Sequence, residues 1–208
     1  MLITRSLTFA HNEENTFVFP NISLAPGEDL LILGPSGIGK TTLLHVLAGL
    51  LAPKSGHVEL LGIMLNKLPV KQLDKFRGRH IGLVFQRPHF IRSLSLQENM
   101  ALLQHLAGKK QDQLRIKQVL SSLNIADKRH KRPYSLSQGE QQRGAIAMAV
   151  LNNPQLILAD EPTSSLDDTN CLNVVSLLKD QAAATNSQLL IITHDNRLKP
   201  QFQNCITL

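Results

Sequence analysis

Residues 30–41 read Leu-Leu-Ile-Leu-Gly-Pro-Ser-Gly-Ile-Gly-Lys-Thr, an apolar run that leads into a glycine-rich loop. The run from Leu30 to Leu33 is typical of a short buried strand, and the residues from Lys40 to about Ala48 carry the apolar stripe of a helix. The loop between them matches G-x-x-x-x-G-K-[ST] in the strand-to-helix context that this motif requires. The stretch therefore predicts an α/β protein that binds a nucleoside triphosphate.

The loop has the chemistry of a phosphate cradle. Its glycines let backbone N–H groups turn inward around phosphate oxygens, and the start of the helix adds positive potential. We expect Lys40 to bridge the β- and γ-phosphates and Thr41 to coordinate Mg²⁺ through its hydroxyl. The residues expected to contact the nucleotide are Gly34, Pro35, Ser36, Gly37, Ile38, Gly39, Lys40, Thr41 and Thr42.

Polar residues follow three further apolar runs. The run Leu156 to Ala159 ends in Asp160 and Glu161, the run Leu189 to Thr193 ends in His194, and Gln86 follows Ile81 to Phe85. Ligands of parallel sheets gather at the carboxyl ends of the strands. Two successive acids there can divide the work, so we expect Asp160 to hold the metal and Glu161 to be the general base for an attacking water.

Strand-like and helix-like segments alternate along the chain, which favours an α/β fold with a largely parallel sheet. Residues 2–9 and 16–24 are predicted as strands near the N-terminus, joined by a polar turn. From Pro88 to Tyr134 the sequence is helical, basic and Gln-rich, with no strand-like run. With 208 residues, we expect one domain: an α/β core of about residues 1–87 and 141–208, and a helical subdomain of about 88–140.

Charge and cysteines narrow the class of protein. From Lys67 to Arg132 there are 15 Lys and Arg against 4 Asp and Glu, whereas the rest of the chain has 7 against 12. This basic face is either simply solvated or directed at anionic lipid headgroups or nucleic acid. Cys171 and Cys205 have no metal-ligand spacing, so we expect buried free thiols in a reducing cytosol. The apolar runs are too short to span a bilayer.

Two further runs resemble a known family. Leu136-Ser137-Gln138-Gly139-Glu140 resembles the signature of the ATP-binding cassette (ABC) ATPases, and residues 156–162 resemble their Walker B segment. The resemblance implies that Ser137 and Gly139 meet ATP held by a second subunit. It also implies that His194 is the switch histidine at the γ-phosphate. Gln86 then corresponds to the Q-loop glutamine that contacts Mg²⁺ and water and senses the transport partner, and residues 164–167 to the D-loop, which crosses the dimer interface.

The chain departs from the family pattern in two places. His11, 29 residues before Lys40, stands where the family has an adenine-stacking aromatic. Imidazole offers less stacking area, so we expect weak discrimination of ATP from GTP. The usual signature is LSGGQ, and here Gln138 and Glu140 replace the first glycine and the glutamine. Ser137 and Glu140 form S-x-x-E, which predicts a capping box at the start of a helix.

Residues 140–143 and 159–163 look like the lipoprotein-release and macrolide-efflux branch of the family. The resemblance implies an ATPase that uses ATP and Mg²⁺, a second ATPase subunit, and integral membrane permease subunits. It places the chain peripherally on the cytoplasmic side of the inner membrane, with no nucleic acid expected. The alternatives are an ABC-type ATPase that drives envelope signalling without transport, and a soluble ATPase that acts on nucleic acid.

Overall fold

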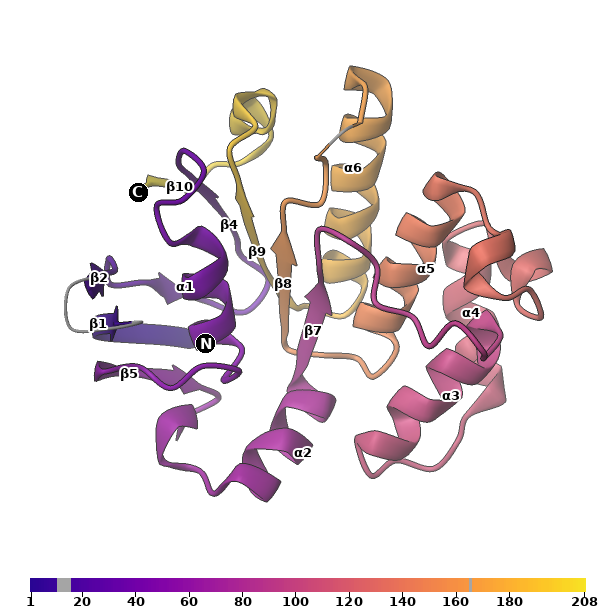
Figure 1. Ribbon diagram of the computed structural model, residues 1–208, viewed down its shortest axis with the longest axis horizontal. Coiled ribbons are helices and arrows are strands. Elements are labelled where there is room, and N and C mark those ends of the chain that lie inside the picture. Colours follow the sequence, from indigo (N-terminus) through magenta and orange to yellow (C-terminus); the bar gives the residue numbers. More distant parts are fainter. Residues whose placement is uncertain (11–15, 165) are drawn as a thin grey trace.

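The computed structural model describes residues 1–10, 16–164 and 166–208 (Figure 1). The strands in these ranges are β1 (Leu2–Ala10), β2 (Thr16–Val18), β3 (Ser23–Leu24), β4 (Asp29–Leu33), β5 (Ser55–Leu60), β6 (Ile63–Met64), β7 (Ile81–Val84), β8 (Leu156–Asp160), β9 (Gln188–Thr193) and β10 (Cys205–Thr207). The α-helices are α1 (Lys40–Leu47), α2 (Val70–His80), α3 (Leu96–Leu106), α4 (Gln113–Ser122), α5 (Gln138–Val150) and α6 (Asp168–Ala184). Short 3₁₀ turns are η1 (Leu65–Lys67), η2 (Ala126–Lys128), η3 (Pro133–Ser135) and η4 (Asn196–Gln201).

A parallel sheet with the strand order β10-β4-β9-β8-β7 forms the centre of the fold. Strands β4, β7, β8 and β9 are largely apolar on both faces because both faces of the sheet are covered there. Along β4, Leu30 and Ile32 belong to one core and Leu31 and Leu33 to the other, as the two-residue period of a strand requires. The register pairs Leu33 with Thr193, so adjacent strands end at nearly the same level.

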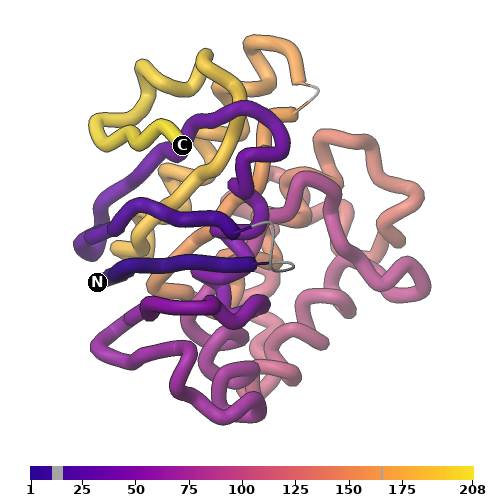
Figure 2. Tube along the Cα trace, turned by 60° about the vertical axis from the view of Figure 1, so that its left-hand side comes forward, coloured from indigo at the N-terminus to yellow at the C-terminus, as the bar shows by residue number. Residues whose placement is uncertain are grey.

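One face of this sheet packs against α1, α2 and a separate antiparallel sheet of β2, β1, β5 and β6, with β3 paired to β1. In Figure 2 these N-terminal strands lie forward, and the segment from about residue 90 to 150 lies behind them on the other side of the molecule. Leu43, Leu44 and Leu47 of α1 are fully buried between the two sheets. This burial fixes the first turn of α1, and with it the loop before the helix.

The other face of the parallel sheet is covered by α3, α4, α5 and α6, which share one apolar core with Leu31, Ile157 and Ile191. Helix α5 lies very close to β7: a Cβ on Gly82 would stand 2.4 Å from the carbonyl oxygen of Ala149. Glycine is therefore required at position 82 for the helix to approach the strand.

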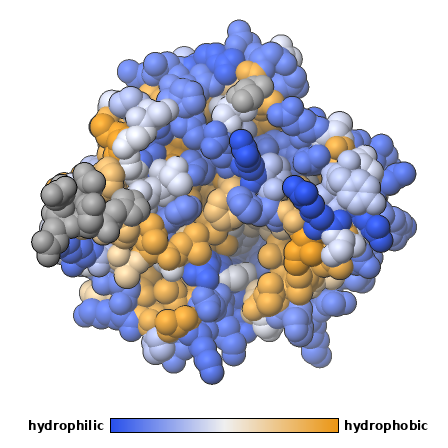
Figure 3. Space-filling model, in the orientation of Figure 1, coloured by the Kyte–Doolittle hydropathy of each residue, from blue (hydrophilic) through white to orange (hydrophobic). Residues whose placement is uncertain are grey.

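An apolar groove of about 500 Å³ opens between α2, β7 and the helices α3 and α5. Its walls include Phe85, Phe90, Leu106 and Met148. Figure 3 shows apolar surface gathered around a hollow near the middle of this face of the molecule.

The expected fold class is confirmed, with the antiparallel strands forming a sheet of their own rather than part of one mixed sheet. Residues 16–24 were expected as one strand, and this is wrong in detail: β2 and β3 are two short strands that both pair with β1. Pro20 lies between them and has no N–H group for a ladder hydrogen bond. Strands β5, β6 and β10 and helices α2 and α6 were not predicted.

The structure also bears on two further expectations from the sequence, the burial of the cysteines and the lack of apolar runs long enough to span a bilayer. Cys171 is buried as expected, but Cys205 is exposed, because it lies on the edge strand β10. Among the residues that the structure describes, none forms a helix with the length and apolar character needed to cross a membrane.

Candidate functional site

The expected site residues meet at the carboxyl edge of the parallel sheet. The glycine-rich loop follows β4, Asp160 ends β8 and Glu161 comes next, His194 follows β9, and Gln86 lies shortly after β7. A pocket of about 360 Å³ opens at this edge. Its lining consists of Phe17, Ser36, Gly37, Gly39, Lys40, Thr41, Thr42, Gln86, Glu161 and His194.

Lys40 is held inside the loop that carries it. Its side chain is almost fully buried, and Nζ donates hydrogen bonds to the carbonyl oxygens of Gly34 (2.9 Å) and Pro35 (3.0 Å). Nζ also lies 3.4 Å from Oε1 of Glu161. A buried ammonium group needs such partners to offset its desolvation. The amino group is thus held in the wall of the pocket, next to the acid that follows β8.

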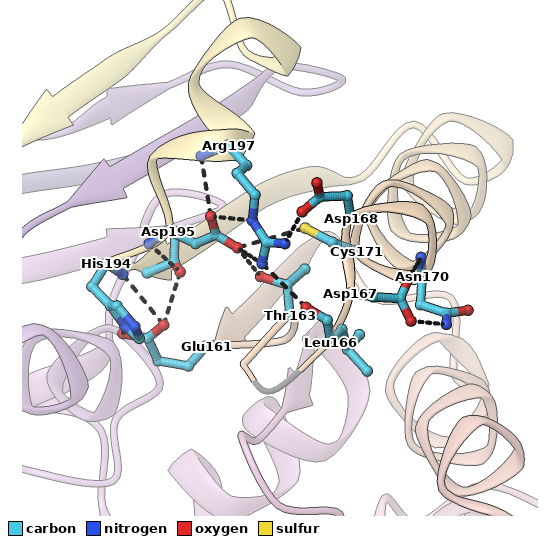
Figure 4. A network of polar contacts seen from close by, with 11 residues as sticks. Glu161, Thr163, Leu166, Asp167, Asp168, Asn170, Cys171, His194, Asp195 and Arg197 are labelled. Atoms are coloured by element: carbon cyan, nitrogen blue, oxygen red, sulfur yellow. Dashed lines mark hydrogen bonds and ion pairs between the residues drawn. The ribbon is translucent and has the colours of Figure 1, made fainter.

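Glu161 is the most constrained residue of the site. Its backbone has φ 47°, a left-handed conformation that non-glycine residues seldom adopt. The carboxylate Oε2 accepts a hydrogen bond from the hydroxyl of Thr193 (2.8 Å), and Oε1 lies 3.0 Å from Nδ1 of His194 (Figure 4). Burial raises the pKa of Glu161, but the hydrogen bonds from His194 and Thr193 outweigh it, so the net pKa lies below the usual value. Glu161 is therefore a carboxylate at neutral pH, oriented by two donors.

Asp160, the neighbour of Glu161, lies in a different environment. Burial raises its pKa above the usual value, and the charge of Glu161 adds to this effect, whereas a hydrogen bond from Thr41 opposes it. Its buried Oδ1 accepts no hydrogen bond from any residue that the structure describes. Carboxylate and hydroxyl oxygens are the ligands that Mg²⁺ prefers. The pair of Thr41 and Asp160 therefore fits a magnesium ion.

Phe17 on β2 was missed by the sequence predictions. Its half-buried ring stacks in parallel on Phe19, with 6.1 Å between the ring centroids, and it lies against Gly39. The pocket is thus polar at Gln86, Glu161 and His194 and aromatic at Phe17. The one available signal was the alternation of Phe17 and Phe19 in a predicted strand. His11, the residue expected in this role, lies outside the described residues.

The structure brings together some predicted residues and not others. Lys40, Thr41, Glu161, His194 and Gln86 line the same pocket. Gly34 and Pro35 contribute carbonyls to Lys40, and Ile38 is exposed at 39% of its surface. Ser137 and Gly139 do not line the pocket; they lie at the start of α5.

The start of α5 confirms the predicted capping box. The hydroxyl of Ser137 accepts a hydrogen bond from the N–H of Glu140 (3.3 Å), and Oε2 of Glu140 accepts one from the N–H of Ser137 (2.8 Å). Lys128 adds an ion pair to Oε1 of Glu140 at 3.2 Å. Ser137, Gln138 and Gly139 are exposed, and a Cβ on Gly139 would meet no atom of the described residues within 4 Å. The helix N-terminus is therefore formed, open and outside the pocket of its own chain.

A strand, a glycine-rich loop and a helix with a buried lysine, next to an acidic strand end, define a P-loop nucleotide-binding protein. The family model described as "ABC transporter" matches residues 20–164. The chain belongs to this family and is an ATP-binding cassette.

Similar proteins with curated names are members of the same family. An ABC transporter ATP-binding protein of Mycobacterium tuberculosis is 36% identical over 190 residues, which is 90% of this chain and 57% of its own length. The lipoprotein-releasing system ATP-binding protein LolD of Chromohalobacter salexigens is 37% identical over 84% of this chain and 74% of its own. The macrolide export ATP-binding/permease protein MacB of Psychrobacter cryohalolentis is 37% identical over 90% of this chain and 28% of its own. The chain thus spans little more than half of the first of these relatives, and the expected similarity to the lipoprotein-release and macrolide-efflux branch is confirmed.

A solved structure gives the same result for the fold. The ATP-binding cassette MJ0796, determined as a dimer in a post-hydrolysis state bound to ADP and Pi, matches with a TM-score of 0.88 and 31% identity. The match covers 100% of this chain and 94% of that one.

The contact between Gly39 and Phe17 generates a stability prediction. Gly39 has φ 97°, and a Cβ there would lie 2.7 Å from the ring of Phe17, whereas Gly37 has φ 85° and no described atom near its Cβ position. Both Gly→Ala variants carry a similar backbone cost. We expect Gly39→Ala to lower the free energy of unfolding by about 1–3 kcal/mol more than Gly37→Ala, because it also overpacks the aromatic ring.

Urea denaturation of the nucleotide-free protein measures this difference, with Gly37→Ala as the matched control. Equal unfolding free energies for the two variants would show that Phe17 does not pack against the loop.

Proposed function

We propose that this chain hydrolyses ATP. The observation that carries the proposal is the Glu161 carboxylate, held between Lys40 and His194 in the pocket of the phosphate loop. Glu161 is ionised, so it can accept a proton from a water that attacks the γ-phosphate. His194, bonded to Glu161 through Nδ1, holds the water in line, and the ammonium group of Lys40 offsets charge on the β- and γ-phosphates.

A magnesium ion fits the same pocket. Thr41 and Asp160 would hold it, with Gln86 as a further contact at the end of β7. Its chemistry there is to neutralise phosphate charge. Oδ1 of Asp160 has no hydrogen-bond partner within the described ranges, and burial raises the pKa of this carboxyl. Both observations support the assignment, since a cation offsets the cost of burying the carboxylate.

The position of the signature supports a dimer. Ser137 and Gly139 are exposed at the N-terminus of α5, outside the pocket of their own chain, and helix N-termini attract phosphate. Two chains related head to tail would place each signature on the nucleotide of the other chain. The solved cassette with 31% identity is described as a dimer bound to ADP and Pi, which supports the same arrangement.

The apolar groove supports a membrane permease as the further partner. It lies beside Gln86, between the α/β core of about residues 1–87 and 141–208 and the helical segment of about 88–140. His89 and Phe90 line it, and Arg87 is exposed beside it. Leu106 is 65% exposed on its rim. An apolar groove of this size fits an inserted helix of a partner, and we assign it to a permease that binds the cassette at the cytoplasmic side of a membrane.

The assignment of Glu161 predicts the effect of Glu161→Gln. The amide keeps the shape of the side chain but cannot accept the proton. We expect ATP affinity to stay near that of the natural chain, hydrolysis to fall by roughly 10²–10⁴-fold, and an ATP-stabilised dimer to accumulate. Phosphate release and light scattering with ATP measure the two effects. Glu59→Gln, on β5 and outside the pocket, is the control; near-normal turnover by Glu161→Gln would refute the assigned base.

The position of Phe17 predicts a base contact. Since Glu161 and His194 mark the γ-phosphate end of the pocket, the aromatic wall at Phe17 lies toward the base or ribose. Stacking on an aromatic ring is worth roughly 1–3 kcal/mol and is tolerant of base identity. Phe17→Ala should therefore weaken ATP and GTP binding alike, by roughly tenfold, as measured by calorimetry. Val18→Ala, 76% exposed on the same strand, should leave both affinities unchanged; the same result for Phe17→Ala would remove Phe17 from the nucleotide site.

If the apolar groove binds a permease, a charge on its rim should impair permease binding but not nucleotide binding. Leu106→Glu places a charge on the rim of the apolar groove, and burying that charge against a partner is costly. We expect the variant to lose co-purification with its permease from detergent-solubilised membranes while keeping nucleotide binding. Leu114→Glu is the matched control, because Leu114 is 66% exposed on α4 and does not line the groove. Equal retention of the permease by both variants would contradict the assignment.

A further inference from the structure

One arginine lies at the centre of a polar network that connects the loop after β9 with the start of α6. Arg197, the second residue of η4, makes a two-pronged contact with Asp195: Nε donates to Oδ1 (2.8 Å) and Nη2 to Oδ2 (2.7 Å). Asp195 directly follows His194. Figure 4 shows the guanidinium group of Arg197 between Asp195 and Asp168. The planar fork of arginine suits such a bidentate contact, which a lysine cannot reproduce.

The other side of the same guanidinium group reaches the segment between β8 and α6. Nη1 donates to Oδ1 of Asp168, and Nη2 lies 3.3 Å from the carbonyl oxygen of Leu166. Leu166 belongs to the loop that resembles the family's D-loop, and Asp168 is the first residue of α6, directly after that loop. Arg197 therefore joins the loop after β9, which carries His194, to the loop after β8.

Asp195 links Arg197 to Glu161, the proposed general base, through one intermediate residue. The N–H of Asp195 donates to the hydroxyl oxygen of Thr193 (3.0 Å), and that hydroxyl donates to Oε2 of Glu161 (2.8 Å). The carboxylate of Asp195 also accepts from the hydroxyl of Thr163 (3.3 Å). Hydrogen bonds from Arg197 lower the pKa of Asp195 to about 2, so the carboxyl group of Asp195 stays ionised at neutral pH.

Exposure separates the two halves of the network. The side chain of Asp195 is 12% exposed, whereas that of Asp168 is 84% exposed. An exposed ion pair contributes little to stability. The bond from Arg197 to Asp168 thus contributes little to the stability of the fold, but it connects the start of α6 to the loop after β9.

We propose that Arg197 is a positioning residue that couples the segment Leu166–Asp168 to His194 and Glu161. This proposal rests on the proposed ATPase and its head-to-tail dimer, in which the loop after β8 lies at the interface. When the second cassette docks, displacement of Leu166 and Asp168 is transmitted through Arg197 and Asp195 to the two residues that place the water. Arg197 does not line the nucleotide pocket, so it acts on the rate of hydrolysis and not on ATP binding.

The test compares Arg197→Gln, Arg197→Lys and Asp168→Asn with the control Lys199→Gln, an exposed residue of the same turn. We expect kcat to fall on the order of tenfold to a hundredfold in Arg197→Gln, with the ATP dissociation constant unchanged. Asp168→Asn keeps the contact between Arg197 and Asp195 and should show the same split between kcat and affinity. The double variant Arg197→Gln/Asp168→Asn should be little slower than Arg197→Gln alone, because both changes act on the same contact between Arg197 and Asp168. Arg197→Lys should not restore the rate.

A second readout does not depend on turnover. The ring NMR signals of His194, assigned with His194→Ala, should shift in Arg197→Gln and Asp168→Asn and stay in place in Lys199→Gln. Unchanged kcat and unchanged His194 signals, or a fall in ATP affinity that matches the fall in kcat, would overturn the role of Arg197. A natural chain that neither hydrolyses ATP nor dimerises would instead contradict the proposed function, and the His194 signals would still decide whether Arg197 positions that residue.

Discussion

The register of the parallel sheet is the constraint on which the site depends. Leu33 pairs with Thr193, Asp160 with Ile192, and Val84 with Ala159, so four strands end at one edge. A slip of one residue in any of these strands would move its apolar side chains to the wrong face, and each face carries a separate core. The two cores thus fix the register, and the register places the phosphate loop, Glu161, His194 and Gln86 around one pocket, with Asp160 directly before Glu161.

Backbone strain and buried charged groups occur together at this edge of the sheet. Glu161 has a left-handed backbone conformation, Lys40 is buried, and Oδ1 of Asp160 has no hydrogen-bond partner among the described residues. Each of these features costs free energy in the single chain and is explained by a phosphate, a cation or a water that it would contact. The same reasoning explains why the signature is open: Ser137 and Glu140 satisfy the helix start by themselves, so Gly139 is left free to approach a phosphate from another chain.

Sequence alone was sufficient for features encoded by local pattern. The phosphate loop, the strand ends with Asp160 and His194, and the capping box at Ser137 were predicted because each depends on a few adjacent residues. The break at Pro20 and the inward position of Phe17 were not, because they depend on pairing with β1 and packing on Gly39. The bond from Arg197 to Asp168 joins residues 29 positions apart and leaves no periodic signal. The domain boundaries and the role of His11 stay predictions.

The central claim is that each site is completed by a second chain, and mixing two inactive variants tests it most directly. Lys40→Ala removes the phosphate contact of one chain, and Gly139→Asp places a negative charge where the signature would meet the phosphate of its partner. Each variant alone should be inactive, but a mixed head-to-tail dimer contains one site with both halves intact. We predict that ATP hydrolysis reappears when the two variants are mixed. If the mixture stays as inactive as its components while each variant remains folded, the site is not shared between chains.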